Sequence, residues 1–282
     1  MNSKTKTVVI TGASSGVGKA TAQLFAGRGW NVVATMRKPA AQTDLTPSAN
    51  LKLVELDVGI PETIHTAVEE AIASFGRIDV WVNNAGYGVF GPVEAASPHK
   101  IQQQFDVNVF GLIECVKAIA PHFRANRSGV LINITSAGGL AASPAYAIYN
   151  ASKFAVEGLS EGLWYELGSF GVKVKLIEPG VTKTDFGGRS MDVLDFSSHK
   201  DYIDLMQKVN TFRAKMVKTP GSAELVAATI FGAANDSSDR LRYLSGSDAK
   251  RLWLLRRWLG SRMQMRLMRN LLKISSGLCC YQ

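Results

Sequence analysis

Residues 7–28 read TVVITGASSGVGKATAQLFAGR: a short β-branched run, a turn with three glycines and a helical pattern. The run Thr7–Thr11 predicts a strand, and residues 19–28 predict the helix after it. In this arrangement the turn and the helix N-terminus aim backbone N–H groups at a phosphate. The stretch therefore predicts an α/β fold that binds a dinucleotide.

Each glycine of this turn has its own part in the prediction. Gly12 permits the tight turn, Gly16 permits close approach of a pyrophosphate, and Gly18 permits close packing of the helix. The spacing is G-x-x-x-G-x-G, which differs from the G-x-G-x-x-G of the general fingerprint. Glycine turns also join strands to helices for structural reasons alone, so that alternative stays open.

Further apolar runs predict a parallel sheet. The runs alternate with helical patterns, as is typical of strands that are buried on both faces. Two of the helical patterns are long, at residues 101–120 and 149–168. The remaining predicted strands are residues 31–38, 51–56, 78–82, 130–135, 171–177 and 242–245.

The size and composition of the chain predict one domain. Its 282 residues, 46% of them hydrophobic, can bury the core of one α/β domain, and no repeat or linker divides them. Three cysteines, Cys115, Cys279 and Cys280, cannot form a disulfide framework, and no signal-peptide pattern precedes the first strand. No apolar run has transmembrane length, and the four histidines lack ligand spacing. We expect a cytoplasmic protein without a metal site.

The end of the second predicted strand indicates the type of dinucleotide. Folds that bind NAD place an acid there, whereas this chain has Met36 followed by Arg37 and Lys38. An acid would repel a 2′-phosphate, and a guanidinium can bind one bidentately. The sequence favours NADP over NAD, although an arginine at a strand end is often merely solvated.

Polar residues follow the third and fourth strands. Asp57 could accept a hydrogen bond from an adenine amino group, or it could cap the helix near Pro61. Small residues in Asn83–Gly86 would let the backbone approach a bound ring. The amide of Asn84 could bridge neighbouring strands, or it could bond its own backbone as a turn residue.

A buried amide is predicted inside the helix at residues 101–120. Asn108 lies between Val107 and Val109, where a polar side chain is often a satisfied core group. It could instead break the local helical hydrogen bonding and hold a water molecule.

The strongest chemical signal is the pair Tyr149 and Lys153. Four residues separate them, so a helix places both on one face. A nearby ammonium lowers the pKa of a phenol, so we expect Lys153 to turn Tyr149 into a usable acid or base. Ser136 follows a predicted strand at the sheet edge where ligands bind. An ordinary surface pair is the alternative for an isolated Y-x-x-x-K.

Together these motifs resemble those of the short-chain dehydrogenases/reductases. The resemblance covers about residues 5–246. It implies an α/β Rossmann-type, doubly wound, parallel seven-stranded sheet in the order 3-2-1-4-5-6-7. It is carried by Thr11-Gly12-x-x-x-Gly16-x-Gly18, Asn83-Asn84-Ala85-Gly86, Asn108, Ser136, Tyr149-x-x-x-Lys153 and Pro179-Gly180.

The resemblance implies hydride transfer between a nicotinamide and a carbonyl or secondary alcohol, by a homodimer or homotetramer. Tyr149 would exchange the proton, Lys153 would lower its pKa and hold the nicotinamide ribose, Ser136 would orient the carbonyl, and Asn108 would sustain a relay water. Ser15 stands where some NADP-preferring members carry a basic residue. The cofactor-binding residues would be Gly12, Ser14, Ser15, Gly16, Val17, Gly18, Arg37, Asp57, Asn84, Ala85, Gly86, Tyr149, Lys153, Pro179, Gly180, Val181 and Thr184.

Two segments decorate the predicted catalytic domain, residues 1–246. Residues 185–218 are expected to form a substrate lid. Residues 247–282 are expected to form a basic amphipathic helical extension, since residues 250–273 carry +8 of the net charge of +9. Because the body itself has little net charge, we expect no nucleic-acid partner.

Three interpretations of the tail compete. It could pack on the body or a partner subunit, attach to an anionic membrane through residues 250–274, or line the substrate entrance. Family members with similar tails act on lipophilic carbonyls, which favours a retinoid, a steroid or another apolar ketone or aldehyde. A non-catalytic dinucleotide sensor or scaffold is the alternative function. The residues expected to line an apolar pocket are Phe90, Val93, Leu140, Pro144 and Tyr146.

Overall fold

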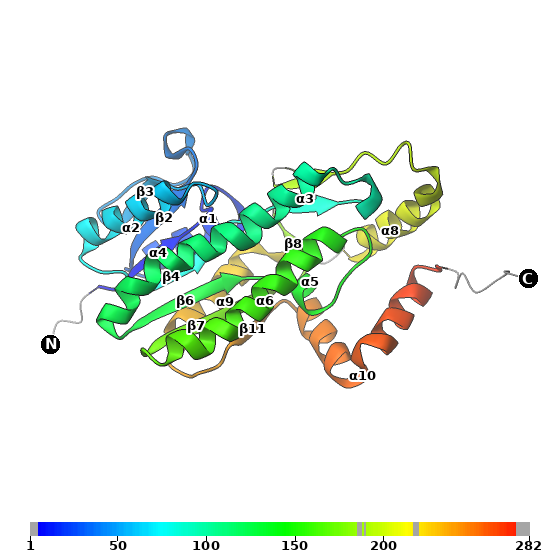
Figure 1. Ribbon diagram of the computed structural model, residues 1–282. Helices are drawn as coiled ribbons and strands as arrows, with labels where there is room; N and C mark the ends of the chain where they lie inside the picture. Colours follow the sequence, from blue (N-terminus) through cyan, green and yellow to red (C-terminus); the bar gives the residue numbers. More distant parts are fainter. Residues whose placement is uncertain (1–4, 185–187, 189, 217–219, 275–282) are drawn as a thin grey trace, which may run out of the picture.

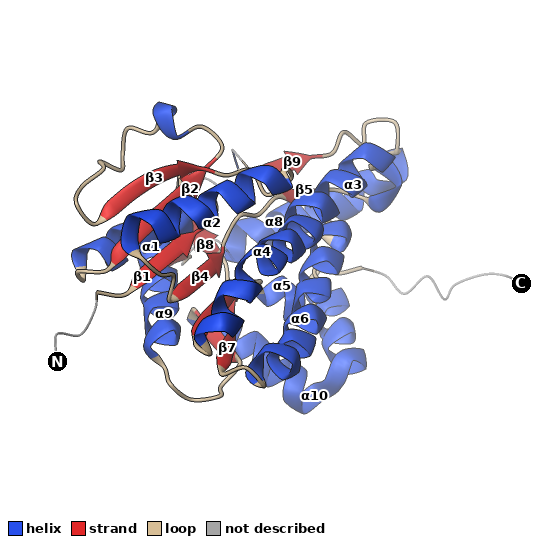
Figure 2. Cartoon of the chain, turned by 60° about the vertical axis from the view of Figure 1, so that its left-hand side comes forward, coloured by secondary structure: helices blue, strands red, loops and turns tan. Residues whose placement is uncertain are grey.

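The computed structural model describes residues 5–184, 188, 190–216 and 220–274. A parallel sheet of seven strands runs through its centre, with helices on both faces (Figures 1 and 2). The order across the sheet is β3-β2-β1-β4-β6-β7-β11, so the predicted order is confirmed. The strands are β1 Thr7–Ile10, β2 Asn31–Met36, β3 Leu51–Glu55, β4 Val80–Asn83, β6 Gly129–Ile134, β7 Val172–Pro179 and β11 Arg242–Ser245.

The two faces of the sheet are covered by different helices. Val8 and Ile10 point to one face, where they join the cluster formed by α1 and α9, whereas Val9 joins the cluster formed by α2, α4 and α6. Both faces are buried, which explains why the strands read as continuous apolar runs. These helices are α1 Gly16–Gly27, α2 Pro61–Phe75, α4 Gly111–Asn126, α6 Ala147–Gly168 and α9 Ala223–Asn235.

The helix predicted at residues 101–120 is present, and its regular hydrogen bonding is broken around Asn108, as one of the two sequence interpretations allowed. Helix α3 (Pro98–Phe105) passes into a π-helical turn, η3 (Asp106–Phe110), before α4 begins. Asn108 lies in this turn and is 2% exposed. Its side chain bonds to the backbone of Tyr87, and π turns form where such contacts disturb regular helical bonding.

Residues 190–216, the described part of the predicted lid, contain the helix that their weakly helical pattern indicates and a strand that the sequence did not reveal. Strand β9 (Met191–Val193) pairs in parallel with β5 (Gly88–Phe90), and helix α8 (Ile203–Met216) follows. The rest of the predicted lid, residues 185–187, 189 and 217–218, lies outside the description. The remaining short elements are η1 Pro39–Ala41, η2 Val93–Ala95, α5 Ala137–Leu140, β8 Thr182–Lys183, η4 Lys200–Tyr202 and β10 Gly221–Ser222.

The tail forms helix α10 (Ser247–Leu271), which bends at Gly260. Beyond the bend, the buried side chain of Leu272 packs with Phe90 of β5 and Met206 of α8. Figure 1 shows the second half of α10 lying beside α8, away from the central sheet. In the described part of the chain, no helix has the length and apolarity to cross a bilayer.

Candidate active site

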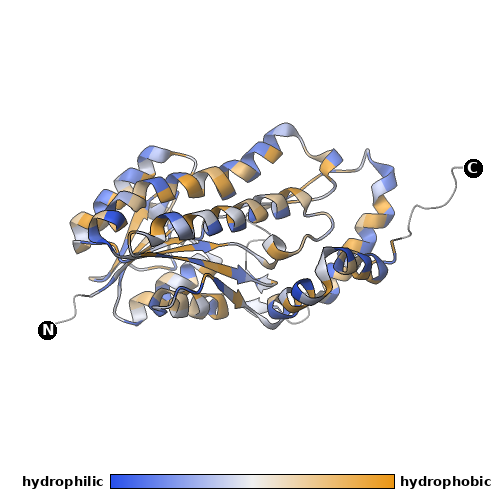
Figure 3. Cartoon of the chain, turned by 60° about the horizontal axis from the view of Figure 1, so that its bottom comes forward, coloured by the Kyte–Doolittle hydropathy of each residue, from blue (hydrophilic) through white to orange (hydrophobic). Residues whose placement is uncertain are grey.

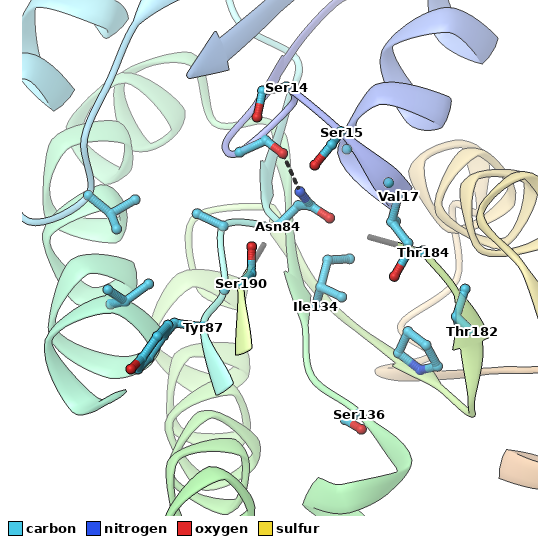
Figure 4. Close-up of a pocket in the computed structure, with 18 of the residues that line it drawn as sticks. Ser14, Ser15, Val17, Asn84, Tyr87, Ile134, Ser136, Thr182, Thr184 and Ser190 are labelled. Carbon is cyan, nitrogen blue, oxygen red and sulfur yellow. Dashed lines mark hydrogen bonds between the residues drawn. The ribbon is translucent and has the colours of Figure 1, made fainter. Parts of the chain in front are cut away.

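A cavity of about 470 Å³ opens at the carboxyl edge of the sheet. In Figure 4, Ser14 and Ser15 lie at one end, Ser136 lies at the other, and Asn84 lies between them. All predicted site residues line this cavity except Asn108 and Val181. Segments that are far apart in the sequence thus converge on one edge, because parallel strands end there together.

The glycine turn is shaped by backbone packing. Gly12 has φ +66°, and a Cβ on it would lie 2.9 Å from Ala85 Cα. A Cβ on Gly18 would lie 2.4 Å from the carbonyl oxygen of Gly12. Larger side chains would push the turn away from the cavity, so glycine is needed here for close approach.

The N-terminus of α1 points into this turn. Ser15 is the N-cap residue, and its hydroxyl makes no capping hydrogen bond. No acidic residue occupies the first turn of the helix. The N-terminal N–H groups and the positive end of the helix dipole therefore suit a phosphate.

Asn84 bridges the ends of β1 and β4. Its side-chain Nδ2 donates to the carbonyl oxygens of Thr11 at 2.9 Å and Gly12 at 3.1 Å. The bridging interpretation of Asn84 is confirmed, and the turn-residue alternative is wrong. The amide holds the glycine turn against the loop of Ala85 and Gly86, which also line the cavity.

The end of the cavity beside β2 contains Arg37 and Asp57, which were predicted to contact the adenosine half of the dinucleotide. Arg37 is exposed at its edge and Met36 is buried beside it. Asp57 also lines the cavity, and its Oδ1 accepts from Gly59 N at 2.9 Å. The cap of α2 is Ile60, so the capping role considered for Asp57 was wrong.

The opposite end holds Ser136, Tyr149 and Lys153. Ser136 caps α5 by accepting from Gly138 N at 3.0 Å, and its side chain also hydrogen-bonds to Tyr149. Tyr149 and Lys153 lie one turn apart on α6, with Lys153 Nζ 5.8 Å from the centre of the phenol ring. The three side chains meet at one point of the cavity.

The charge balance of this group differs from the sequence expectation. Burial raises the pKa of Tyr149 to about 12, against the opposing effect of its hydrogen bond with Ser136. Burial also lowers the pKa of Lys153 to about 8, although Glu157 opposes this shift. The predicted lowering of the Tyr149 pKa by Lys153 is therefore wrong for the protein alone. The Lys153 ammonium is directed to the carbonyl of Ile134, at 3.0 Å, so burial of the phenol dominates.

The amide of Asn108 is occupied by protein groups. Its Oδ1 accepts from Tyr87 N at 2.8 Å, and its Nδ2 donates to Tyr87 O at 2.9 Å and Ser152 Oγ at 3.0 Å. The side chain is therefore a satisfied core group, which was one of its two sequence interpretations. It fixes the loop after β4 to the π turn.

A residue of the tail helix holds the turn at Pro179-Gly180 in place. Asp248, in the first turn of α10, accepts a hydrogen bond from Val181 N at 2.6 Å. Because this N–H faces Asp248, Val181 does not line the cavity, and the sequence placed it wrongly. Thr182 and Thr184 line the cavity instead.

Four polar side chains at the substrate end escaped the sequence prediction. Tyr87, Gln103, Ser190 and Asp192 line this part of the cavity. Tyr87 donates its hydroxyl to Asp192 Oδ2 at 2.7 Å, and Lys100 pairs with the same carboxylate. They were missed because Asp192 reaches the site through the β5–β9 pairing, which has no local sequence signal.

The residues expected to form an apolar pocket do not line the cavity. Phe90 and Tyr146 pack together in the cluster with α8, with their ring centres 4.9 Å apart, while Val93 is 50% exposed. No described residue of α10 lines the cavity either. The residues predicted to form the apolar lining and the described part of the tail therefore lie outside this cavity.

The chain is similar in sequence to several oxidoreductases. An uncharacterized oxidoreductase of Schizosaccharomyces pombe is 41% identical over 216 residues, which cover 75% of this chain and 88% of the relative. A 3-ketodihydrosphingosine reductase of Bacteroides thetaiotaomicron is 40% identical over 198 residues, covering 70% of this chain and 71% of the relative.

Solved structures extend the likeness to nearly the whole chain. A short-chain dehydrogenase from Streptomyces avermitilis has a TM-score of 0.82 and 30% identity, covering 98% of this chain and 100% of that one. ElxO with bound NADP has a TM-score of 0.69 and 27% identity, covering 85% and 97%. A short-chain dehydrogenase/reductase from Burkholderia phymatum in complex with NAD has a TM-score of 0.76 and 25% identity, covering 98% and 99%.

The short chain dehydrogenase sequence profile matches residues 6–193, two thirds of the chain. That span includes the glycine turn, Asn84, Ser136, Tyr149 and Lys153, which the fold gathers at one sheet edge. The chain belongs to the short-chain dehydrogenase/reductase family of oxidoreductases.

Proposed function

We propose that the protein is an NADP(H)-dependent oxidoreductase that interconverts a ketone or aldehyde and the corresponding alcohol. The observation that carries this proposal is the convergence of Ser136, Tyr149 and Lys153 with a dinucleotide cradle in one cavity. A phosphate cradle alone would serve a sensor equally well. A buried acid–base group beside it is what a hydride-transfer enzyme needs.

The cavity fits a dinucleotide phosphate. The glycine turn and the N-terminus of α1 would hold the pyrophosphate, and a Cβ on Gly12 or Gly18 would intrude on this turn. Arg37 would bind the 2′-phosphate, and Asp57 would face the adenine. Thr182 would contact the nicotinamide end, and Thr184, which lies against Gly16 of the glycine turn, would contact the pyrophosphate.

The catalytic residues handle the proton. NADPH, when bound, would supply the hydride to the carbonyl carbon. Ser136 orients the carbonyl oxygen, and Tyr149 Oη donates a proton to it as negative charge develops there. Lys153 holds positive charge beside the phenol and binds the ribose hydroxyls. In the reverse direction Tyr149 accepts the proton from the alcohol.

The proton must be replaced from solvent after each reduction. We propose that the backbone of the π turn around Asn108 binds the relay water, because the Asn108 amide is already satisfied. A π turn leaves backbone groups outside the regular helical pattern, where they can bind a water. The Asn108 side chain then acts by keeping that turn in shape.

The substrate end favours a lipophilic ketone that carries a polar group near the carbonyl. Tyr87, Gln103 and Asp192 line this end, together with the apolar Val107. A 3-ketodihydrosphingosine, on which the 40% identical relative acts by name, has an amine and a hydroxyl beside its ketone and a long hydrocarbon chain. Asp192, which already binds Lys100 and Tyr87, would accept a further hydrogen bond from such an amine or hydroxyl group.

A screen of NADPH oxidation tests the proposal. The substrates are 3-ketodihydrosphingosine, a steroid ketone, retinal and a simple aldehyde, each with NADPH and NADH. We expect turnover with at least one ketone or aldehyde, faster with NADPH, and fastest with the amino ketone. NADPH binding without turnover on any of the four would favour the sensor instead.

The exposed face of α10 supports contact with an anionic membrane. Eight large apolar side chains stand exposed there, Trp258 most of all at 79%. Residues 249–274 also include eight arginines and lysines and no acid. In Figure 3 hydrophobic and hydrophilic residues intermingle along this helix. A second copy would bring the same positive charge, whereas anionic lipid complements both the charge and the apolar groups.

Vesicle sedimentation tests the membrane contact. We expect the protein to sediment with phosphatidylserine-containing vesicles but not with pure phosphatidylcholine vesicles, and to lose most of this binding in Trp258→Ser/Met263→Ser. Ile60→Ser is the matched control, since Ile60 is 48% exposed on the sheet domain. Equal sedimentation of both variants would reject the proposal.

A homodimer or homotetramer is also proposed. Phe110, Phe154 and Tyr165 are 52%, 40% and 73% exposed along η3 and α6, where a partner subunit could cover them. Sedimentation equilibrium with Phe154→Ser tests this, and a monomeric wild-type protein would reject it.

A further inference from the structure

A second cluster of charged side chains lies behind the catalytic group and has no part in the proposed chemistry. Glu157 follows Lys153 by one turn of α6, and Glu178 comes from β7. The Glu157 side chain is 9% exposed and that of Glu178 is fully buried. Arg242, at the start of β11, lies against both.

Arg242 cannot satisfy all the acids around it. Its Nε donates to Glu157 Oε2 at 3.2 Å, and its NH2 group donates to Glu157 Oε2 at 3.1 Å and to Glu161 Oε1 at 2.6 Å. Glu178 Oε1 lies 3.2 Å from the same Nε. Among the described residues, no well-aligned hydrogen bond reaches either carboxylate oxygen of Glu178, although the Arg242 guanidinium lies against Oε1.

Two buried carboxylates beside one guanidinium are costly when both are ionised. A proton on Glu178 removes one negative charge and lets its carboxyl group donate to Glu157. Burial and the nearby Glu157 accordingly raise the pKa of Glu178 to about 8. The pKa of Glu157 is raised by burial but held down by its bonds to Thr135 and Arg242, so Glu157 is the ionised partner.

Glu157 also touches both flanks of the catalytic serine. Thr135, just before Ser136, hydrogen-bonds to Glu157. A Cβ on Gly139, three residues after Ser136, would lie 3.3 Å from Glu157 Oε1. The charge of Glu157 raises the pKa of Lys153 and so keeps its ammonium protonated.

We infer that Glu157 and Glu178 hold one proton between them, and that the charge of this pair, one helical turn beyond Lys153, sets the pH range over which Lys153 stays charged. The inference rests on the proposed function of Lys153. Glu157 is a positioning residue in this scheme, since it acts through Lys153. Loss of the shared proton at alkaline pH adds negative charge behind Lys153, which favours its ammonium form.

The groups that face the pair come from few elements. Helix α6 contributes Lys153 and Glu161, and β11 contributes Arg242. Helix α5 and strand β6 contain no ionisable residue. Asp248 of α10 faces Val181 N. Glu161 is 56% exposed, so water screens its charge and makes it a matched control.

The first experiment measures kcat/KM for reduction with NADPH as a function of pH. The negative charge of Glu157 favours the protonated, more positive forms of Tyr149 and Lys153. Removing that charge therefore lowers the pKa of both groups. We expect Glu157→Gln/Glu178→Gln, in which neither residue can carry the charge, to move the alkaline fall in kcat/KM to lower pH by about one unit, and Glu161→Gln to leave it in place. A lower kcat with an unmoved profile would mean a structural role only and would overturn the inference.

The second experiment follows Tm against pH and needs no turnover. The folded-state pKa of Glu178 lies above its unfolded value of about 4.3, so the proton stabilises the fold at low pH, and this stabilisation is lost as the pH rises to about 8. Glu178→Gln has no carboxyl group at this position to deprotonate, so its stability does not fall in this way. Its Tm relative to wild type should therefore rise by about 5 °C or more between about pH 5 and pH 8.5.

The two experiments separate the inference from the proposed function. A constant Tm difference between Glu178→Gln and wild type, like that expected for Glu161→Gln, would exclude the shared proton. A wild-type protein that turns over no ketone would contradict the proposed function, and the Tm curves would still decide whether the proton exists. If the Glu157 variant does not fold, the Tm curves of Glu178→Gln and wild type still test the shared proton.

Discussion

The cofactor end and the substrate end of the cavity differ in whether backbone or side-chain atoms form their surface. At the cofactor end, backbone and small residues at the tips of β1, β2 and β4 make the surface, with Gly12 and Gly18 in contacts that tolerate no Cβ. At the substrate end, the surface consists of side chains such as Tyr87, Gln103 and Asp192 from loops and the β5–β9 pairing. A nucleotide-binding surface that depends on backbone position cannot vary much. A surface of side chains can change its substrate without changing the fold.

Ser136, Tyr149 and Lys153 stand where the two ends meet, so their removal should have the largest effect. Tyr149→Phe removes the proton donor and leaves the cofactor end intact. We expect kcat to fall by about 10²–10⁴-fold while the Kd for NADPH changes less than about threefold. Steady-state kinetics and cofactor titration check this, and near-native turnover would refute the role of the phenol.

The cofactor end should be intolerant of one added methyl group. Gly18→Ala places a Cβ 2.4 Å from a backbone carbonyl, so we expect NADPH affinity to fall by about tenfold or more. Gly27→Ala in the same helix is the matched control, because a Cβ there meets nothing within 4 Å. Isothermal titration of both variants checks this, and similar affinities would show that the turn adjusts more freely than its packing indicates.

Arg37 is expected to affect the binding of NADPH, which carries the 2′-phosphate, but not that of NADH. Arg37→Ser removes a charged partner of the 2′-phosphate, and we expect the Kd for NADPH to rise by about tenfold while that for NADH stays within about twofold. Fluorescence titration with both cofactors measures the ratio. An equal effect on both cofactors, or none on either, would mean that the guanidinium is solvated and that NADP preference has another origin.

The smallest effect is expected at the substrate end, and it should depend on the substrate. Asp192→Asn keeps the shape but removes the negative charge that balances Lys100, so an amine on the substrate would meet the uncompensated Lys100 ammonium. We expect KM for 3-ketodihydrosphingosine to rise by about fivefold, with kcat and the kinetics of a simple aldehyde unchanged. If both substrates lost activity equally, Asp192 would support the loop rather than select the substrate.

The difference between the two ends of the cavity also explains which residues could be predicted from the sequence. The glycine turn, Arg37 and the pair on α6 depend on local spacing, and parallel strands bring their ends together without further information. The π turn at Asn108 depends on a contact with Tyr87, and Asp192 reaches the cavity only through the β5–β9 pairing. Long-range contacts of this kind leave no periodicity in the sequence.

Two other predictions from the sequence failed, one for the contacts of Val181 and one for the pKa of Tyr149. The family resemblance placed Val181 at the cofactor, and it could not show that Asp248, 67 residues away in the tail helix, holds the Val181 N–H. The expected shift in the Tyr149 pKa took account of the ammonium but not of burial, which acts in the opposite direction. Burial is a property of the folded chain as a whole.

Isotope transfer is the most direct test of the central claim that the two ends of the cavity meet in a hydride-transfer site. Wild-type protein and Tyr149→Phe would be incubated with NADPH deuterated at the transferable position and with 3-ketodihydrosphingosine, and the product would be analysed by mass spectrometry. We predict that the wild-type product gains one deuterium at the carbonyl carbon and that Tyr149→Phe, with NADPH bound, forms almost none. Bound NADPH that passes no deuterium to this ketone, to the steroid ketone, to retinal or to the simple aldehyde would contradict the account.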